Sequence, residues 1–556
     1  MSASDSWKLL VFRDGKRVLK GPGLLRALLR QIENVLSLSD FDSQFARDEL
    51  IDALLRAGEL ECALADREGC EPQSLAIAEV TDALARALVA LRAPNFAHGS
   101  LGLVSKLRVP ERLTLSPPEG FCYYALHPLD CADLLKENAI DAGVAAVIGI
   151  RSIGATLSSV VRAWFEVNGR AAERITVRPT GHPFDRKLSF TAEQRQWIAG
   201  NLERSARFFV VDEGPGLSGS SFLAVAEALV ETGTPHDRIV LVPSSEPNLG
   251  ALLAADAQAR WRRFPTLPLK PTRYVPEDAA QFVGGGEWRR RVFKDMDNDE
   301  SEWPAVWSWT ERQKYLSADG GRIFRFDGHG HYGKTVRQRS EILAAAGWGP
   351  ATSSAGNGFS VSPWLDQTRA PVPDRNAVIQ LARYCAFRAR HFGCDVSSNL
   401  ELERMARVNL DRALGVSSSL TLPIERPVVS DARMMPHEWI RNADGRLLKV
   451  DAASHGDDHF YPGPTDIAWD LAGAMVEWRL DRQWSELLVS EYTQVSDDRI
   501  DRRLPTYLLA YCVFRLAFSL SAGMSVSKIQ ERTRFEREAG IYRQRLETLL
   551  HLSTAA

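Results

Sequence analysis

The chain has few cysteines and no motif that would hold a structural metal. Seven cysteines are scattered over 556 residues, and no two of them form a Cys-x-x-Cys pair. Disulfide frameworks and zinc sites need cysteines at short, regular spacings. We therefore expect reduced thiols in a cytoplasmic protein, with neither disulfides nor zinc.

Long apolar runs and an excess of charge are also missing. No stretch approaches the length of a transmembrane helix, and the first residues lack the apolar core of a signal peptide. The formal net charge of −3 offers no basic surface for sequence-independent binding of nucleic acid. We expect a soluble protein of about two to four domains that acts on small molecules, without nucleic-acid or membrane partners. Its oligomeric state is not readable from the sequence.

Residues 1–110 show a short strand followed by helical periodicity. The pattern predicts a strand from Trp7 to Phe12 and helices at 24–36, 43–56, 59–65 and 76–91. No motif in this region carries chemistry. We expect it to cover or pack against the domain that follows.

Strands and helices alternate in residues 111–250. The pattern predicts strands at 121–125, 145–150, 174–177, 207–211 and 238–242, with helices at 129–138, 157–167, 192–202 and 222–231. Such alternation is typical of an α/β fold with a doubly wound parallel sheet, which binds ligands at the carboxyl ends of its strands.

The strand at 207–211 leads into two acidic residues and a loop of glycine and serine. Asp212 and Glu213 follow the strand, and Ser218-Gly219-Ser220-Ser221 precedes the next helix. Backbone N–H groups in such a loop, with the positive end of the helix dipole, favour a phosphate. The whole stretch resembles the PRPP-binding motif of type I phosphoribosyltransferases. An ordinary strand-to-helix turn with Ser218 as N-cap is the alternative.

This resemblance implies a role for each part of the region. Asp212 and Glu213 would be catalytic, because they would hold the ribose hydroxyls and keep Mg²⁺ near. The other PRPP-binding residues would be Gly216, Ser218, Gly219, Ser220 and Ser221 around the 5-phosphate, and Arg151, Ser152 and Gly154 around the pyrophosphate. The polar segment 178–188 matches the family's mobile loop, where Lys187, Arg186 or His182 would neutralise the departing pyrophosphate.

A proline-rich stretch at 251–272 is predicted to be a linker, after which the alternation stops. Segments 281–286, 290–293, 314–316 and 322–326 predict a small antiparallel sheet, followed by a helix at 336–346. Between them, Gly328 to Thr335 matches the G-x-x-x-x-G-K-T spacing of a P-loop. By that match the nucleotide-binding residues would be Gly328, Gly330, Gly333 and Lys334. A glycine-rich connection without a ligand is the alternative, because no repeated strand–helix pattern follows.

Four later segments carry a second resemblance. They are Gly358–Leu365, Ser430–Trp439, Gly445–Asp451 and Pro464–Gly473. Their order resembles the lobe hinge, catalytic loop, metal-binding strand end and acidic helix start of aminoglycoside and choline kinase-like phosphotransferases. The resemblance implies a bilobal kinase-like α+β domain, with an N-lobe at 273–365 and a helical C-lobe at 366–556.

The kinase resemblance also assigns residues. Asp431 would be the catalytic carboxylate and Asp451 the metal ligand, while Arg325 would replace the family's nucleotide-binding lysine. Asp466 and Asp470 would tie the lobe together, or be an N-cap and a buried structural carboxylate. His455, Asp457, Asp458 and His459 form either a metal site or a solvated loop.

Three hypotheses about function follow. The main one is a PRPP-dependent phosphoribosyltransferase that uses Mg²⁺ and releases pyrophosphate. The second is an ATP-dependent small-molecule kinase in the C-terminal half, with a pseudokinase left open. The third is a non-enzymatic sensor of PRPP or a nucleotide. The acceptor and the pathway are not readable from the sequence.

Overall fold

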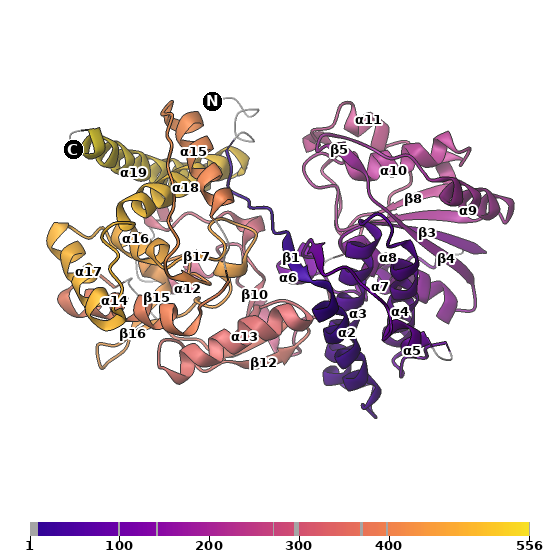
Figure 1. Ribbon diagram of the computed structural model, residues 1–556, viewed down its shortest axis with the longest axis horizontal. Helices are drawn as coiled ribbons and strands as arrows, with labels where there is room; N and C mark the ends of the chain where they lie inside the picture. Colours follow the sequence, from indigo (N-terminus) through magenta and orange to yellow (C-terminus); the bar gives the residue numbers. More distant parts are fainter. Residues whose placement is uncertain are drawn as a thin grey trace.

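The computed structural model describes residues 9–97, 100–140, 143–270, 272–293, 300–366, 371–395 and 399–554. The chain forms two halves that lie side by side in Figure 1, the N-terminal one in indigo and magenta and the C-terminal one in orange and yellow. Trp7, where we predict the first strand to begin, lies outside the described residues.

A four-stranded parallel sheet forms the centre of the N-terminal half. Its order is β4 (Ala171–Val177), β3 (Val144–Ile150), β7 (Arg207–Val211) and β8 (Ile239–Val242). Each strand lies within a few residues of its predicted range. The strands β3, β7 and β8 are buried apolar runs, whereas β4, at the sheet edge, is only partly buried and contains Glu173 and Arg174. Residues 265–269 continue the sheet beyond β8, where Leu241 N donates to Pro265 O at 2.9 Å. The stretch predicted to be a linker, 251–272, therefore contains the helix Ala257–Trp261 and then part of this sheet edge.

Helices cover both faces of this sheet, as the alternation predicts (Figure 1). On one face α8 (Ile153–Val167) packs with Phe209 and Val211, backed by α3 (Gln44–Ala65) and α4 (Glu71–Ala90). The other face carries α9 (Ala192–Glu203), α10 (Ser220–Glu231) and α11 (Ala257–Trp261) over Phe208 and Val210. The doubly wound arrangement follows from this alternation of buried side chains.

The strand predicted at 121–125 does not form. Residues 119–122 are instead the short helix α6 (Glu119–Cys122), whose Phe121 N and Cys122 N donate to Pro118 O. Phe121 is fully buried, and its carbonyl accepts from His329 N of the C-terminal half at 2.9 Å. The apolar run therefore reflects burial at the junction of the halves.

The N-terminal helices are longer than predicted. The helices α2 (Gly21–Leu36) and α3 are joined by residues 37–43, and α3 runs without a break through both predicted segments, 43–56 and 59–65. A Cβ atom on Gly58 would lie 2.2 Å from Thr156 Oγ1. Gly58 thus lets α3 approach α8 closely. The remaining elements of this half are β1 (Arg17–Lys20), α5 (Ser100–Val104), β2 (Arg112–Leu115), α7 (Asp130–Glu137), β5 (Thr180–His182) and β6 (Asp185–Lys187).

The first described residues pack on the C-terminal half. Leu9 and Val11 belong to its hydrophobic core. Leu10 N donates to Asn409 Oδ1 at 2.7 Å, and Tyr461 N donates to Val11 O at 3.2 Å. The chain then crosses to β1, so the two halves are interlocked (Figure 1).

A five-stranded antiparallel sheet opens the C-terminal half. Its order is β12 (Ser353–Gly356), β13 (Phe359–Pro363), β11 (Arg322–Phe326), β10 (Lys314–Ser317) and β9 (Ala279–Phe282), with α13 (Gly330–Ala345) between β11 and β12. Residues 290–293, predicted as a strand, lie mostly in the helical turn α12 (Arg289–Val292). A turn with Arg289 bound to Glu531 explains the difference, since this ion pair fixes the segment against the last helix.

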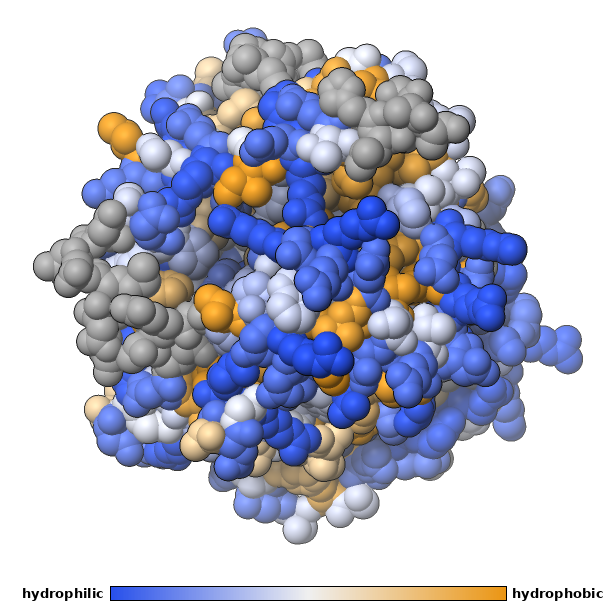
Figure 2. All heavy atoms as spheres, turned by 90° about the vertical axis from the view of Figure 1, so that its left-hand side faces the viewer, coloured by the Kyte–Doolittle hydropathy of each residue, from blue (hydrophilic) through white to orange (hydrophobic). Residues whose placement is uncertain are grey.

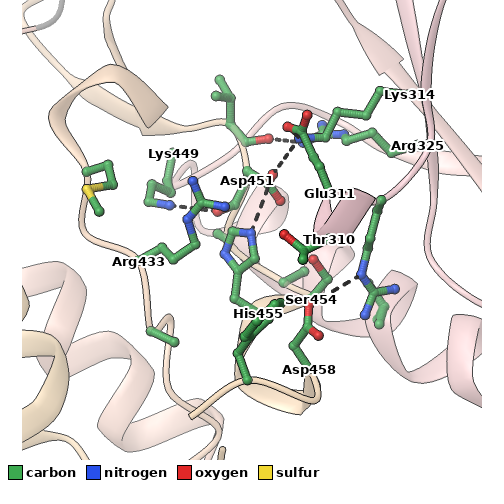
Figure 3. Close-up of a pocket in the computed structure, with 18 of the residues that line it drawn as sticks. Thr310, Glu311, Lys314, Arg325, Arg433, Lys449, Asp451, Ser454, His455 and Asp458 are labelled. Carbon is green, nitrogen blue, oxygen red and sulfur yellow. Dashed lines mark hydrogen bonds and ion pairs between the residues drawn. The ribbon is translucent and has the colours of Figure 1, made fainter. Parts of the chain in front are cut away.

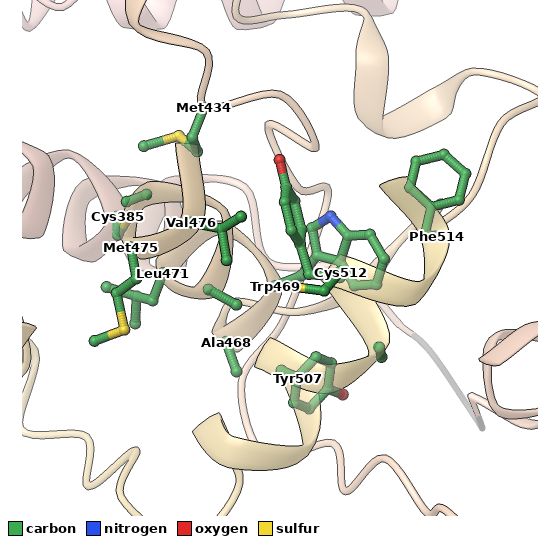
Figure 4. Packing of buried hydrophobic residues seen from close by; sticks show 14 of the residues in the cluster. Cys385, Met434, Ala468, Trp469, Leu471, Met475, Val476, Tyr507, Cys512 and Phe514 are labelled. Carbon is green, nitrogen blue, oxygen red and sulfur yellow. The ribbon is translucent and has the colours of Figure 1, made fainter. Parts of the chain in front are cut away.

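A helical lobe follows the sheet. Its helices are α14 (Arg375–His391), α15 (Leu400–Leu414), α16 (Ala468–Glu477), α17 (Arg482–Ser496), α18 (Leu504–Ser525) and α19 (Ile529–Thr554). Between them lie short strand pairs, β14 (Pro427–Val428) with β17 (Thr465–Asp466) and β15 (Trp439–Arg441) with β16 (Leu447–Lys449). Figure 4 shows Trp469 of α16 packed among Tyr507, Cys512 and Phe514 of α18. A sheet followed by a helical lobe is the bilobal arrangement that the kinase resemblance implies.

One helix, α18, is long and apolar enough to cross a membrane, although no run of that kind is expected from the sequence. The most apolar window of α18 is 67% buried inside the protein, as in the core helix of a soluble domain. Figure 2 shows the face formed by the C-terminal half, where hydrophilic side chains dominate and apolar ones are scattered among them. The burial of α18 therefore explains its apolar composition.

All seven cysteines are free thiols, and six of them are buried.

Candidate functional site

A cavity of about 150 Å³ lies between the five-stranded sheet and the helical lobe. We call it the interlobe cavity. Lys314 and Arg325 line it from the sheet, while Arg433, Asp451 and His455 line it from the lobe (Figure 3). These charged groups converge from opposite sides, which is the arrangement of a ligand site and not of a packed core.

Lys314, on strand β10 of the sheet, contributes an ammonium group to this cavity. It pairs in register with Arg325 across β10 and β11. Its Nζ lies 2.8 Å from Glu311 Oε1 and 3.3 Å from Asp451 Oδ2. Burial disfavours its charge, but the carboxylates of Glu311 and Asp451 outweigh burial and raise the pKa of Lys314. Glu311 is fixed in turn by hydrogen bonds from Gly286 N and Trp288 Nε1.

Arg325 lines the cavity, as a nucleotide-binding residue would, but its guanidinium is already engaged. It donates to the carbonyl of Val450 and, at 3.1 Å, to Ser362 Oγ. The sequence suggests that Arg325 replaces a missing lysine. On the neighbouring strand, Lys314 places an ammonium in the same cavity.

Asp451 stands where the kinase resemblance places a metal ligand. It follows β16 and faces the cavity, with its Oδ2 3.6 Å from His455 Nε2. Burial works to raise its pKa, but His455 and Lys314 together hold the pKa of Asp451 well below its usual range. Asp458 is a second carboxylate that lines the cavity. Oxygen donors of this type suit Mg²⁺, so the residues present fit the ion.

Asp431 is not placed as the predicted catalytic carboxylate. Its side chain is fully buried, and it accepts a hydrogen bond from the hydroxyl of Tyr384. The ammonium of Lys449 lies 3.2 Å from its Oδ1. Asp431 is not among the residues that line the cavity, whereas Arg433, two residues later, is. The prediction is therefore wrong for this structure, because a neighbouring lysine and tyrosine hold the carboxylate inside the lobe.

Asp466 and Asp470 tie the lobe together, as predicted. Asp470 accepts from Asp431 N at 2.8 Å and from Ala432 N at 3.0 Å. Asp466 accepts from Arg426 N at 2.8 Å and from Arg503 Nε at 2.9 Å. Both carboxylates are fully buried, and Asp470 fixes the loop before Arg433.

A possible cation site lies beside the cavity. One ligand atom each from Asp431, Glu438 and His455 lies within 4.8 Å of the others. However, Lys449 Nζ lies 3.2 Å from Asp431 and 2.8 Å from Glu438, and Arg433 lies 2.8 Å from Glu438. Two protein cations therefore already neutralise these carboxylates, and the set fits a metal less well than Asp451 does.

The four residues at 455–459 form neither a metal site nor a solvated loop. Their side chains diverge: Asp457 lies 2.5 Å from Arg339, His455 faces Asp451, and Asp458 pairs with His459. Arg312 Nε lies 3.9 Å from Asp458 Oδ2. The segment is packed into the wall between the sheet and the lobe, because each charge has a partner.

The P-loop prediction is also wrong. Helix α13 begins at Gly330, so most of the motif is helical and does not wrap around a phosphate. A Cβ on Gly333 would lie 1.9 Å from Gly328 O, so this glycine allows a close backbone contact. Lys334 lies 2.7 Å from Glu49 and 3.1 Å from Asp52 of α3. Gly328, Gly330 and Lys334 therefore lie against the N-terminal half, whereas Gly333 packs within its own half.

A second, open cleft of about 860 Å³ lies at the junction of the halves. We call it the junction cleft. Asp212 and Glu213 line it from the end of β7, Tyr124 lines it from the loop after α6, and Trp309 and Gln313 line it from the C-terminal half. It lies at the carboxyl end of the parallel sheet, where such folds bind ligands.

Asp212 and Glu213 carry unusual protonation behaviour. Burial raises the pKa of Asp212 to about 7 and that of Glu213 to about 8. The nearby carboxylate of Glu119 adds to the second shift. The predicted acidic pair therefore lies in the cleft without enough positive charge nearby to offset the effect of burial on the two pKa values.

The serines of the predicted phosphate cradle point elsewhere. Ser218 Oγ and Ser220 Oγ donate to Pro183 O at 2.8 and 2.7 Å, and both side chains are buried. Gly219 has a φ of 73° and precedes α10. Of the predicted 5-phosphate residues, Gly216 lines the cleft, whereas Ser218, Gly219, Ser220 and Ser221 do not. The hairpin β5–β6 holds the two serines, so the phosphate grip is not formed in this structure.

The predicted pyrophosphate residues are only partly in place. Ser152 lines the cleft. Arg151 is turned to the end of α3, where it donates to Ala65 O at 2.9 Å and Asp66 Oδ1 at 3.0 Å. A Cβ on Gly154 would lie 2.7 Å from Val211 O, so this glycine serves the packing of strand against helix. The roles predicted for Arg151 and Gly154 are contradicted by these contacts.

Lys187 is on the predicted mobile segment, which forms the β5–β6 hairpin. Its ammonium lies 2.8 Å from Asp185 on the same hairpin, and its side chain is 73% exposed. It lines neither cavity. The predicted catalytic role of Lys187 has no support in this geometry.

Comparison of the sequence with protein families and with curated proteins gives no match. Solved structures give matches at low scores. A choline/ethanolamine kinase family protein from Mesorhizobium loti is 16% identical, with a TM-score of 0.30, and the match covers 48% of this chain and 94% of that one. A choline kinase from Streptococcus pneumoniae is 14% identical, with a TM-score of 0.28 and coverage of 42% and 90%. An aminoglycoside phosphotransferase from Alicyclobacillus acidocaldarius is 11% identical, with a TM-score of 0.26 and coverage of 44% and 91%.

About half of the chain is thus similar in outline to these kinases. None of these comparisons supports the phosphoribosyltransferase resemblance.

Proposed function

We propose that the C-terminal half is a phosphotransferase that passes a phosphoryl group from ATP to a small molecule. The observation that supports this most is the meeting of Lys314 and Arg325 from the sheet with Asp451 from the lobe. Phosphoryl transfer depends mainly on positioning and on neutralising the phosphate charge. A cavity where cations and carboxylates from the sheet and from the lobe meet provides both.

Each charged group has a part in this proposal. Lys314 and Arg325 would neutralise the nucleotide phosphates, and Arg433 would add charge from the lobe. Asp451 would hold Mg²⁺, which supplies charge neutralisation at the transferred phosphoryl group. Asp458, which lines the cavity and pairs with His459, would orient the acceptor in place of Asp431, which does not line it.

The present cavity is smaller than a nucleotide needs. Its volume of about 150 Å³ lies below the range of about 300–1,000 Å³ typical of small-molecule sites. The ion pair between Lys314 and Asp451 spans the two lobes. Phosphates and Mg²⁺ would replace this pair, so we propose that nucleotide binding opens the lobes.

A thermal shift assay with ATP and Mg²⁺ tests the proposal. We expect a rise in Tm for the wild type that Lys314→Ala and Asp451→Asn each remove. Lys187→Ala is the matched control, because that lysine lies on an exposed hairpin outside the cavity. No shift in the wild type, or an unchanged shift in both cavity variants, would refute the proposal. Slow ATP hydrolysis then separates an active transferase from a kinase-like protein that only binds nucleotide.

A second function, PRPP-dependent transfer in the N-terminal half, is favoured by one observation. Asp212 and Glu213 lie next to each other at the end of β7 and line the cleft. They would hold ribose hydroxyls, and Mg²⁺ would accompany the phosphates. The serine hydroxyls must first leave Pro183, so the β5–β6 hairpin has to move. A PRPP or nucleotide sensor would use the same contacts without a reaction.

Calorimetry with PRPP and Mg²⁺ tests this second function. The wild type should bind, and an Asp212→Asn/Glu213→Gln double variant should not. Pyrophosphate release with candidate acceptors then distinguishes a transferase from a sensor. Absence of binding by the wild type would exclude both.

A further inference from the structure

The junction cleft contains an aromatic platform supplied by the C-terminal half. Trp309, in the turn Ser308–Thr310, lines the cleft and is 49% exposed. Its indole stacks on Phe12 with ring centroids 6.0 Å apart and meets Trp307 edge-on at 5.0 Å. Two aromatic neighbours therefore hold the indole in place while much of its surface stays open.

The cleft is also strongly acidic. Six carboxylates line it: Asp14, Glu119, Asp130, Asp212, Glu213 and Glu246. Among the described lining residues Lys270 is the one ammonium, and its Nζ lies 2.5 Å from Glu137. Burial raises the pKa of Glu119, Asp130, Asp212 and Glu213, and a cation bound among these carboxyl groups would favour their ionised forms.

We propose that the junction cleft binds a small organic cation that carries a planar ring. The ring would stack on Trp309, and the ammonium would lie toward Glu119 and Glu213. Aromatic faces attract rings and cations, and desolvated carboxylates pair with ammonium groups. This site goes beyond both functions proposed above, because ATP would occupy the other cavity and the contacts proposed for PRPP do not include Trp309.

The platform lies on a segment that serves both cavities. Trp309 and Gln313 line the junction cleft, whereas Glu311 and Lys314 line the interlobe cavity. Tyr124 lines the junction cleft and contacts His459 Nε2 at 2.8 Å, next to Asp458 of the interlobe cavity. The cation site is therefore completed by the C-terminal half and is not a property of the parallel sheet alone.

The test uses tryptamine and indole-3-acetate, two indoles of similar size and opposite charge. Saturation-transfer NMR and a titration on the full chain compare their binding. We expect tryptamine to bind at least about tenfold more tightly than indole-3-acetate, because a charge pair and a stacked ring act together. Equal binding of the two indoles, or no binding of tryptamine, overturns the proposal.

Variants locate the site. Trp309→Ala should weaken tryptamine binding by about five- to tenfold, and Trp309→Phe should retain most of it. Glu119→Gln should reduce the difference in affinity between tryptamine and indole-3-acetate. Trp484→Ala, on α17 outside both cavities, is the control. Unchanged tryptamine binding in a folded Trp309→Ala variant would show that the indole is not the platform. The Trp309→Ala variant should still show the ATP-induced rise in Tm. Failure of the cation site can therefore be distinguished from failure of the kinase proposal.

Discussion

The acidic pair in the junction cleft should make the stability of the protein depend on pH. Asp212 and Glu213 have pKa values raised from 3.8 to about 7 and from 4.5 to about 8. A raised pKa means that the folded protein holds protons that the unfolded chain has already lost. The stability supplied by the protonated forms is complete below about pH 4 and is lost as the pH rises through 7 to 8.

The size of the effect follows from the shifts. One pKa unit corresponds to about 1.36 kcal/mol, so a shift of about three units gives at most about 4 kcal/mol per group. Both side chains are half-buried and interact with each other, and solvent screening reduces this limit. We expect the pair to contribute about 1–3 kcal/mol of destabilisation at pH 9 relative to pH 5.5.

In the Asp212→Asn/Glu213→Gln double variant, neither side chain can gain or lose a proton between pH 5.5 and pH 9. Chemical denaturation at pH 5.5 and pH 9 should show a variant that is more stable than the wild type, by a larger margin at pH 9 than at pH 5.5, because pH 5.5 already lies above the unfolded-state pKa of both carboxyls. Asp237→Asn, on the exposed turn before β8, is the control and should leave the profile of the wild type unchanged. If the double variant loses as much stability between the two pH values as the wild type does, the two carboxyls are not strained and this reasoning fails.

Three further predictions test how the structure is held together. Lys334→Ala should leave the ATP-induced thermal shift intact and lower the free energy of unfolding by no more than about 1 kcal/mol, because this lysine forms ion pairs with α3. Loss of the thermal shift in this variant would instead support a nucleotide-binding role for the P-loop motif. Gly58→Ala should cost about 1–3 kcal/mol in urea unfolding, because its Cβ meets Thr156, whereas Gly200→Ala on α9 has open space and should be neutral or stabilising; equal effects would contradict the packing argument. Ser218→Ala/Ser220→Ala should speed proteolysis within residues 178–188, because both hydroxyls anchor Pro183, and an unchanged cleavage rate would show that they do not.

The parallel sheet was predictable because its strands have one environment along their whole length. Residues 207–211 and 144–150 are apolar runs buried on both faces, and that pattern fits few other structures. The segment 121–125 has a similar apolar composition but forms a helical turn. Its burial comes from the other half of the chain, which no local pattern reveals.

The sequence predicts a site residue correctly only where that residue directly follows a strand, because the end of the strand then fixes its position. Asp212, Glu213 and Asp451 follow strands and line cavities, as the sequence predicts. Lys314 was missed because its role depends on the register of β10 against β11 and on the approach of the lobe. Ser218 and Ser220 were misplaced because their hydroxyls find an acceptor at Pro183, 35 and 37 residues away along the chain.

Contacts between the halves explain why their sites cannot be treated separately. The α3 carboxylate of Asp52 is almost fully buried and accepts from His331 N at 2.9 Å, while Lys334 adds a second contact. Leu9 and Val11 leave the N-terminal half to complete the core of the C-terminal one. Cutting the chain at the predicted linker would therefore expose apolar surface on one piece and remove His331 and Lys334 from Asp52 on the other, where only Arg56 of its described partners remains. The junction cleft would also lose Trp309, so any ligand that needs this indole requires the intact chain.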